Sequence, residues 1–414
     1  MNRSALWLTA LGASLVAFPA RAAQVVPVAL PDSGDTGWLL AATILGLLLA
    51  VPGAWLVAAA PAGRVALLRA VPATGAALAA AALLYVLIGY SFAFDTTEGL
   101  PIGAILGGTG NWMLSLMGIV REGTNIPETA FAFYQYAYLA IAIALLCGAL
   151  AAHVRGGWLV GFAAIWSLIV FAPLARWMWG GGWVSARGGL DMAGGLVVFY
   201  AAGVSAVIAL ALAGAGNRHS GPADPYARGV GAALLLVGML AVTGASTLGA
   251  SDGSAVAIIV MLVSACTAML AAAAFARSLD GAVLARGLLA GTVGAAAAGD
   301  GLSMGGAVLM GLFCALAASI GPRLMPKIFA RHAGDGTLIA LTGAAKTGAF
   351  LLAFLLAFYP FGGSGYADGM TMAGQVVEQL IAIIAVAAWS VIGTLIAALS
   401  IGMVMPMRSP NPAS

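Results

Sequence analysis

One stretch of the sequence is most informative about the fold: Leu190-Asp191-Met192-Ala193-Gly194-Gly195-Leu196-Val197-Val198. Its single carboxylate, Asp191, is followed by small residues and then by an apolar run that continues to about residue 213. An aspartate at the start of a helix accepts hydrogen bonds from the first backbone N–H groups. We therefore expect Asp191 to cap a long apolar helix.

That apolar run is one of eleven along the chain, each of about the 20 residues that a helix needs to cross a bilayer. Hydrophobic residues make up 62% of the 414 residues and charged residues only 7%, a balance that soluble proteins of this length do not have. We predict an all-α membrane protein with eleven transmembrane helices in one membrane domain, residues 24–407. The spans are 37–60, 73–94, 129–151, 157–179, 191–213, 229–248, 254–276, 285–300, 303–321, 337–358 and 374–404.

The order of the spans indicates an internal repeat. Five spans precede the polar loop from Asn217 to Arg228, five follow it, and the last span, 374–404, is longer than the others. This order predicts two inverted five-helix repeats plus a final long helix. Repeats of this kind place a solute pathway near the middle of the membrane, where the two halves meet.

The N-terminus has the pattern of a cleavable signal peptide over residues 1–23, because Arg3 precedes the apolar run Ala5–Phe18 and the small-residue site Ala20–Ala23. Arginines are concentrated in the loops that an outside N-terminus would place inside, as cytoplasmic loops require. We expect a bacterial inner (plasma) membrane protein with a periplasmic N-terminus and a short cytoplasmic tail, residues 408–414.

Several classes of function are disfavoured by composition. The net charge of +3 comes from scattered basic residues, which is not the pattern of a nucleic-acid-binding surface. All three cysteines, Cys147, Cys266 and Cys314, lie inside apolar segments, so neither a disulfide nor a metal site is expected. The chain has no catalytic motif in a context that would support one, and we expect neither an enzyme nor a cofactor.

Three stretches resemble the ammonium transporter (Amt/Mep/Rh) family: Gly89–Phe94, Trp177–Trp183 and the stretch around Asp191. The resemblance extends over the mature chain and is strongest from Gly89 to Ser205. It implies the ammonium-transporter fold, transport of ammonium or ammonia, and a homotrimer in which each subunit has its own hydrophobic pore. Because the tail is short, the PII-type regulator that binds the tail of many family members is not expected here.

The resemblance also implies a substrate-binding vestibule on the outer side of the membrane. Trp179 and Ser246 match the residues that recruit the ammonium cation, by an indole face and a hydroxyl. Asp191 matches a buried aspartate that organises this site without touching the substrate. Outside the family, Trp179 could equally be a tryptophan of the membrane interface, and Asp191 could be a helix cap only.

Below the vestibule the family has a pore gate of two stacked phenylalanines, and here this sequence differs. The first position matches Tyr138, with Tyr134 one turn earlier on the same helix face. The second matches Val242, which is too small to stack on a ring. Ordinary packing of an aromatic side chain within a helix is the alternative interpretation of the tyrosines.

The sequence differs further at the family's two mid-pore histidines, whose positions match Phe199 and Thr342. The only histidines of the chain, His153, His219 and His332, are expected in or beside cytoplasmic loops. Lys346 lies one turn beyond Thr342, near the middle of a span. We expect it to face the pore or to pair with a carboxylate, because both span ends are too distant for the side chain to reach water.

Ammonium or ammonia transport is therefore the leading functional hypothesis, with two alternatives. Lys346 in the pore would favour another small neutral or anionic solute, because a buried positive charge repels ammonium. A non-conducting sensor subunit that binds ammonium at the vestibule is the second alternative.

Overall fold

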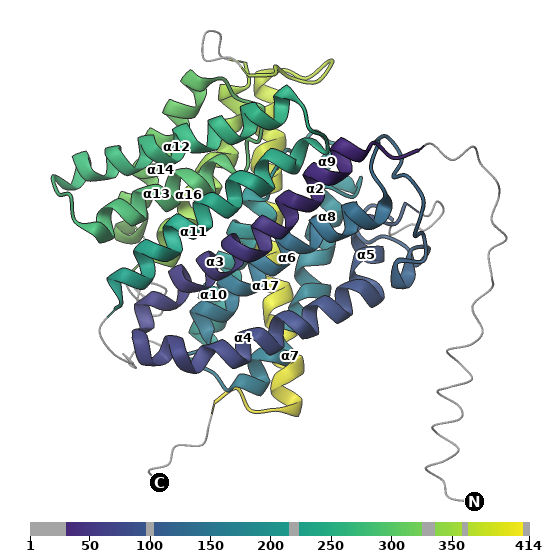
Figure 1. Ribbon diagram of the computed structural model, residues 1–414. Helices are drawn as coiled ribbons and strands as arrows, with labels where there is room; N and C mark the ends of the chain where they lie inside the picture. The colour runs from purple at the N-terminus through teal and green to yellow at the C-terminus, as the bar shows by residue number, and fades with distance from the viewer. Residues whose placement is uncertain (1–29, 97–102, 215–222, 325–335, 358–362, 409–414) are drawn as a thin grey trace, which may run out of the picture. The chain divides into compact units, whose positions relative to one another are not determined.

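The computed structural model describes residues 30–96, 103–214, 223–324, 336–357 and 363–408. The expected signal peptide, residues 1–23, lies outside the described residues, as does the expected tail except for Arg408. The described residues are almost entirely helical (Figure 1).

The membrane spans of the first half are built from several consecutive helical segments. They are α2 (Ser33–Leu45), η1 (Gly46–Ala50), α3 (Val51–Ala59) and η2 (Ala60–Ala62); α4 (Arg64–Leu84), η3 (Tyr85–Gly89) and α5 (Tyr90–Phe94); α6 (Glu128–Leu150); α7 (Gly156–Trp166), η5 (Ser167–Phe171), α8 (Ala172–Met178) and α9 (Trp183–Ala186); and η6 (Gly195–Tyr200) with α10 (Ala201–Leu212). A short turn, η4 (Trp112–Leu114), lies in the loop before α6.

The second half has simpler helices. They are α11 (Pro225–Gly244) with η8 (Ala245–Thr247), α12 (Asp252–Ala276), α13 (Gly281–Ala295), α14 (Met304–Leu324), α16 (Thr337–Leu355) and the 33-residue α17 (Met372–Val404). Helix α17 is the expected final long helix.

The expected membrane architecture is confirmed. Within the described residues, ten helical runs are long and apolar enough to cross a membrane, and each coincides with a span expected from the sequence. The span expected at 285–300 is the exception, because α13 has only 15 residues and ends at Ala295. The apolar residues that follow form a turn, in which Gly299 has a φ of +52°.

Wider π-helical turns interrupt four spans of the first half: η1, η3, η5 and η6. Two of them have a direct cause in the sequence, since Pro52 follows η1 and Pro173 follows η5 at the second position of the next helix. Proline has no N–H to donate and its ring clashes with the carbonyl one turn earlier, so the helix widens there.

Helix α6 is the most buried span, with 89% of its most apolar window inside the protein. It contacts α2, α3 and α4 on one side and α10 on the other. The second-half helices α12, α13, α14 and α16 pack against one another as a group, and α11 lies between this group and α3 (Figure 1). Side chains of α6 that point toward α11 therefore lie where the two halves meet.

The two halves also meet through backbone hydrogen bonds. The N–H groups of Met192 and Ala193, just before η6, donate to the carbonyls of Ala297 and Ala296, just after α13, at 3.1 and 2.8 Å. Backbone N–H groups that are buried inside a protein need hydrogen-bond partners, and a turn before a helix must find them elsewhere. The early end of α13 thus supplies the partners for the turn that carries Asp191.

Candidate functional site

Asp191 closes the turn that begins the fifth span. Its Oδ2 accepts hydrogen bonds from the N–H groups of Leu196 and Val197, both at 2.9 Å. The side chain is 3% exposed, and its Oδ1 has no hydrogen-bond partner among the described residues. Burial raises the pKa of this carboxyl, which precedes the span, to about 6, against the lowering effect of the backbone N–H bonds. At neutral pH the site therefore holds a buried negative charge with one unpaired oxygen.

The glycine pair after Asp191 makes this turn possible. Gly194 has a φ of +91°, which side chains other than glycine rarely adopt. A Cβ at Gly195 would lie 2.8 Å from the backbone nitrogen of Ala297, so only glycine allows the two halves to approach this closely. The Asp-Met-Ala-Gly-Gly sequence is explained by these two requirements together with the carboxylate.

Trp179 is fixed against the same turn. It follows α8, and its indole N–H donates to the backbone carbonyl of Asp191 at 2.5 Å. Its ring lies 5.0 Å from the ring of Tyr138, tilted by 37°, and the side chain is partly exposed. The indole is thus held in one orientation by the backbone of Asp191 and lies beside Tyr138, the first residue of the expected gate.

The two tyrosines of the expected gate are bonded to each other and to the second half. The hydroxyl oxygens of Tyr134 and Tyr138 are 2.7 Å apart, and the Tyr134 hydroxyl also donates to the backbone carbonyl of Val242 at 2.7 Å. The side chain of Val242 packs against η1, because a Cβ at Gly46 would lie 2.3 Å from its Cγ2. Val242 therefore meets the tyrosines through its backbone oxygen.

Ser246 lies one turn beyond Val242, in η8. Its hydroxyl donates to the carbonyl of Thr243 at 2.8 Å, which leaves the lone pairs of its oxygen available. Among the described residues no hydrogen bond joins Ser246 to Trp179. Trp179 follows α8 and contacts the Asp191 turn. Ser246 follows α11, whose last turn contacts Tyr134.

Phe199 and Thr342, the positions expected in mid-pore, lie on adjacent helices. Phe199 is in η6, 1% exposed, and α16 packs against both η6 and α10. Thr342 lies directly against Gly203 of α10, one turn after Phe199, and its hydroxyl donates to the carbonyl of Leu338 at 2.7 Å. The hydroxyl proton of Thr342 is therefore used within its own helix.

Lys346 is exposed on the single chain. Its neighbours one turn away, Thr342 and Phe350, are partly exposed. No ion pair of Lys346 with a carboxylate is present among the described residues. The pairing expected as one possibility is thus not seen there.

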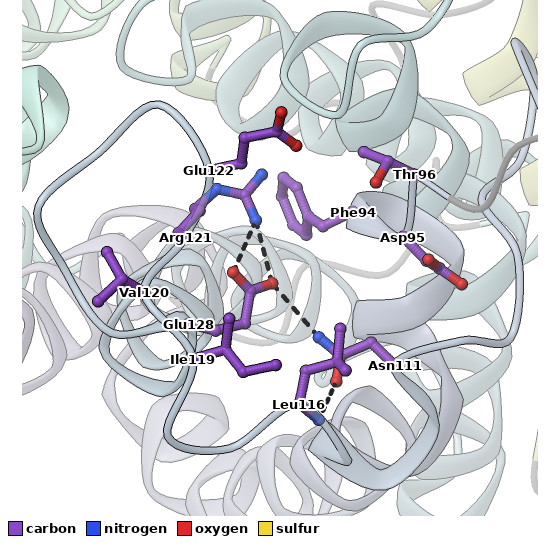
Figure 2. A pocket seen from close by; sticks show the side chains of 10 residues that line it. All are labelled: Phe94, Asp95, Thr96, Asn111, Leu116, Ile119, Val120, Arg121, Glu122 and Glu128. Atoms are coloured by element: carbon purple, nitrogen blue, oxygen red, sulfur yellow. Dashed lines mark hydrogen bonds and ion pairs between the residues drawn. The ribbon is translucent and has the colours of Figure 1, made fainter. Parts of the chain in front are cut away.

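A second polar cluster lies at the C-terminal end of the second span, around a cavity of about 330 Å³ (Figure 2). The Glu128 carboxylate accepts from Arg121 Nη1 at 3.1 and 3.2 Å, from the amide of Asn111 at 3.3 Å, and from the Tyr90 hydroxyl. The Arg121 guanidinium also lies 3.7 Å from the ring centre of Phe131. These bonds tie the loop before α6 to the ends of the second and third spans.

This cluster was not expected from the sequence. Its sequence signal is a glutamate, Glu128, at the first position of an otherwise apolar helix. Since Arg121 and Glu128 are 18% and 12% exposed at their side chains, removing either leaves a partly desolvated charge. The cluster is therefore best understood as structural support for the loop before α6.

Gln379 was also not expected at the site. It is 0% exposed in α17 and clamps the backbone of Leu190: its amide donates to the Leu190 carbonyl at 2.6 Å and its oxygen accepts from the Leu190 N–H at 3.1 Å. Gln375, one turn earlier, donates to the carbonyl of Gly188 at 2.8 Å. Two amides four residues apart in an apolar helix are the sequence signal for this clamp, which fixes the residue before Asp191.

Comparison with known proteins agrees with the family resemblance seen in the sequence. The sequence profile described as the Ammonium Transporter Family matches residues 37–412. A putative ammonium transporter of Methanothermobacter thermautotrophicus is 31% identical over 294 residues, which are 69% of this chain and 71% of that protein. Ammonium transporter Amt1 of Archaeoglobus fulgidus is 32% identical over 241 residues, or 57% of this chain and 59% of that one.

The fold agrees with a solved structure. The crystal structure of Mep2 from Saccharomyces cerevisiae superposes with a TM-score of 0.79, covering 92% of this chain and 88% of that one at 22% sequence identity. The profile match extends over nearly all of the membrane domain, from the first span to the end of the last. The chain belongs to the ammonium transporter family.

Proposed function

We propose that this protein binds ammonium at the site formed by Trp179, Asp191 and Ser246 and passes it, as ammonium or ammonia, through a pore between its two halves. The chain is a membrane transporter and not an enzyme. The observation that carries the proposal is the indole of Trp179, held by the backbone carbonyl of Asp191, whose own buried carboxylate has an unpaired oxygen.

Each part of this site favours a small cation. A cation over an indole face gains about 0.5–2 kcal/mol. The negative charge of Asp191 adds attraction that is strengthened by the low dielectric of the protein interior. Ser246 supplies a hydroxyl oxygen that can replace one of the waters lost by the ion. The fixed geometry means that little side-chain entropy is lost on binding.

We further propose that conduction takes place without a histidine pair. The chain has three histidines, His153, His219 and His332, none of which is in an expected span. Phe199 has no polar atom, and the Thr342 hydroxyl is already bonded to Leu338. A side-chain relay for protons of the kind that histidines provide is then absent from these two positions. Transfer of the neutral molecule is the mode that this composition favours.

The remaining features of the proposal concern location and assembly. The protein is proposed to be a homotrimer in a bacterial inner membrane, with the vestibule toward the periplasm and the C-terminus in the cytoplasm. A leader over residues 1–23 belongs to the same proposal. The bias of arginines toward the inner loops supports this orientation.

Binding to the purified protein tests the vestibule. Trp179→Ala should weaken ammonium binding by at least several-fold, measured by titration calorimetry against sodium chloride as the blank. Trp55→Ala is the matched control, since Trp55 is also a partly exposed tryptophan but lies in α3. Equal affinity of Trp179→Ala and the parent would contradict the vestibule assignment.

A further inference from the structure

We infer that Tyr134 accepts the hydrogen bond of the Tyr138 hydroxyl, so that the Tyr138 oxygen can only accept hydrogen bonds from a solute. The gate then selects solutes that donate N–H bonds. This inference rests on the proposed function and deepens it. It makes Tyr134 a positioning residue and Tyr138 the residue that the solute meets.

The direction of the hydrogen bonds follows from counting protons. A carbonyl oxygen can only accept, so the 2.7 Å contact between Tyr134 and the Val242 carbonyl uses the single hydroxyl proton of Tyr134. The 2.7 Å contact between the two hydroxyls must then be donated by Tyr138. The opposite direction would leave the Tyr134 and Val242 oxygens facing each other at 2.7 Å without a proton between them.

The Tyr138 oxygen is thereby left with lone pairs and no proton to offer. Tyr134 is its only hydrogen-bond partner among the described residues. Both tyrosines are buried, at 1% and 2% exposure, and a buried relay of this kind has few ways to reorient. An ammonium ion or an amine donates N–H bonds to such an oxygen, whereas an anion meets only lone pairs and is repelled.

The ring of Tyr138 lies next to the proposed vestibule. The ring lies 5.0 Å from that of Trp179, and a Cβ at Gly194 would lie 3.3 Å from its Cδ1. Tyr138 is therefore in contact both with the cation-binding indole and with the turn that carries Asp191. A solute that leaves Trp179 meets Tyr138 next.

The relay also joins the halves of the protein. Tyr134 is in α6, and the Val242 carbonyl belongs to the last turn of α11, 108 residues away. The next two carbonyls of α11 receive side-chain donors as well: Ser246 donates to Thr243 at 2.8 Å and Trp38 to Gly244 at 3.4 Å. The end of α11 that carries Ser246 is thus fixed partly by Tyr134.

A double-mutant cycle tests the inference. Tyr134→Phe keeps the ring and frees the Tyr138 proton, so ammonium affinity should fall by about fivefold, the typical effect of one hydrogen bond. In a Tyr138→Phe background the same change should have no further effect. The matched control is Tyr136→Phe, which removes a hydroxyl bonded to a backbone carbonyl, that of Leu78, from the same helix.

Two results would overturn the relay: parental affinity in Tyr134→Phe, or an equal loss in the Tyr138→Phe background, which would indicate a purely structural role. The C–O stretching bands of isotope-labelled tyrosine report donor and acceptor states without any ligand. In the parent protein these bands should show that Tyr138 donates a hydrogen bond and accepts none. An acceptor signature of Tyr138 in the parent would contradict the relay. A folded parent that binds no ammonium would instead contradict the proposed function.

Discussion

The indole nitrogen of Trp179 lies 2.5 Å from the backbone oxygen of Asp191, a residue 12 positions later in the chain. The carboxylate of the same aspartate accepts hydrogen bonds from the N–H groups of Leu196 and Val197. One residue therefore fixes the indole ring of Trp179 with its backbone and supplies a negative charge with its side chain.

The charge of Asp191 should set the pH dependence of binding. Burial raises the pKa of this carboxyl to about 6, so the carboxylate is protonated and loses its attraction for a cation as the pH falls through that value. Ammonium affinity of the parent should decrease between about pH 7 and pH 5. Asp191→Asn should bind several-fold more weakly at neutral pH and show no such decrease. A pH profile of Asp191→Asn that parallels the parent would show that another group titrates.

Gln379 should act through the position of Leu190 and Asp191. Gln379→Leu leaves the partly buried N–H and carbonyl of Leu190 without partners, at up to about 1–3 kcal/mol for each group. We expect a lower melting temperature and weaker ammonium binding. The control is Glu378→Gln, which breaks the ion pair between Glu378 and Arg187 and should change stability by less than about 1 kcal/mol. Thermal unfolding in detergent compares the two, and equal melting temperatures would contradict the clamp.

Phe199 and Thr342 should make transport electrically silent or nearly so. Neither side chain titrates near neutral pH, so no proton relay accompanies the solute through these positions. An ammonium jump on a solid-supported membrane should give far less current than a family member with both pore histidines at equal protein density. A comparable current would mean that water or Lys346 carries the charge.

Lys346 tests how far the pore extends along α16. A charged lysine within about 5 Å of the path would repel a cation by roughly 3 kcal/mol at an effective dielectric of 20. Lys346→Leu should then raise methylammonium uptake, whereas Lys346→Arg should not. A decrease in Lys346→Leu would mean that a neutral amine assists passage. Unchanged uptake with an intact assembly would place Lys346 outside the path, on the surface where the single chain exposes it.

The spans and the Asp191 turn could be predicted from the sequence because both are local. Apolar length reports burial in lipid, and an aspartate before two glycines reports a capped turn. Apolar length does not report where a helix ends inside the protein. The span expected at 285–300 therefore contains a helix that ends at Ala295, where its carbonyls turn to meet Met192 and Ala193.

The contacts at the site between residues that are distant in the sequence could not be predicted in the same way. Tyr134 and Val242 are 108 residues apart, and Gln379 and Leu190 are 189 apart. Each pair depends on how the two halves pack, which no local pattern encodes. The resemblance identified Val242 as a gate side chain, whereas its backbone oxygen is the atom that meets the tyrosines. Tyr138 was identified, but the direction of its hydrogen bond required the structure.

The most direct test of the account is uptake of radiolabelled methylammonium into proteoliposomes that contain the purified protein. We predict uptake well above that of protein-free liposomes, inhibited by ammonium chloride and strongly reduced in Trp179→Ala. Uptake equal to that of protein-free liposomes, by a protein shown to be folded and correctly inserted, would contradict the claim that this chain transports ammonium.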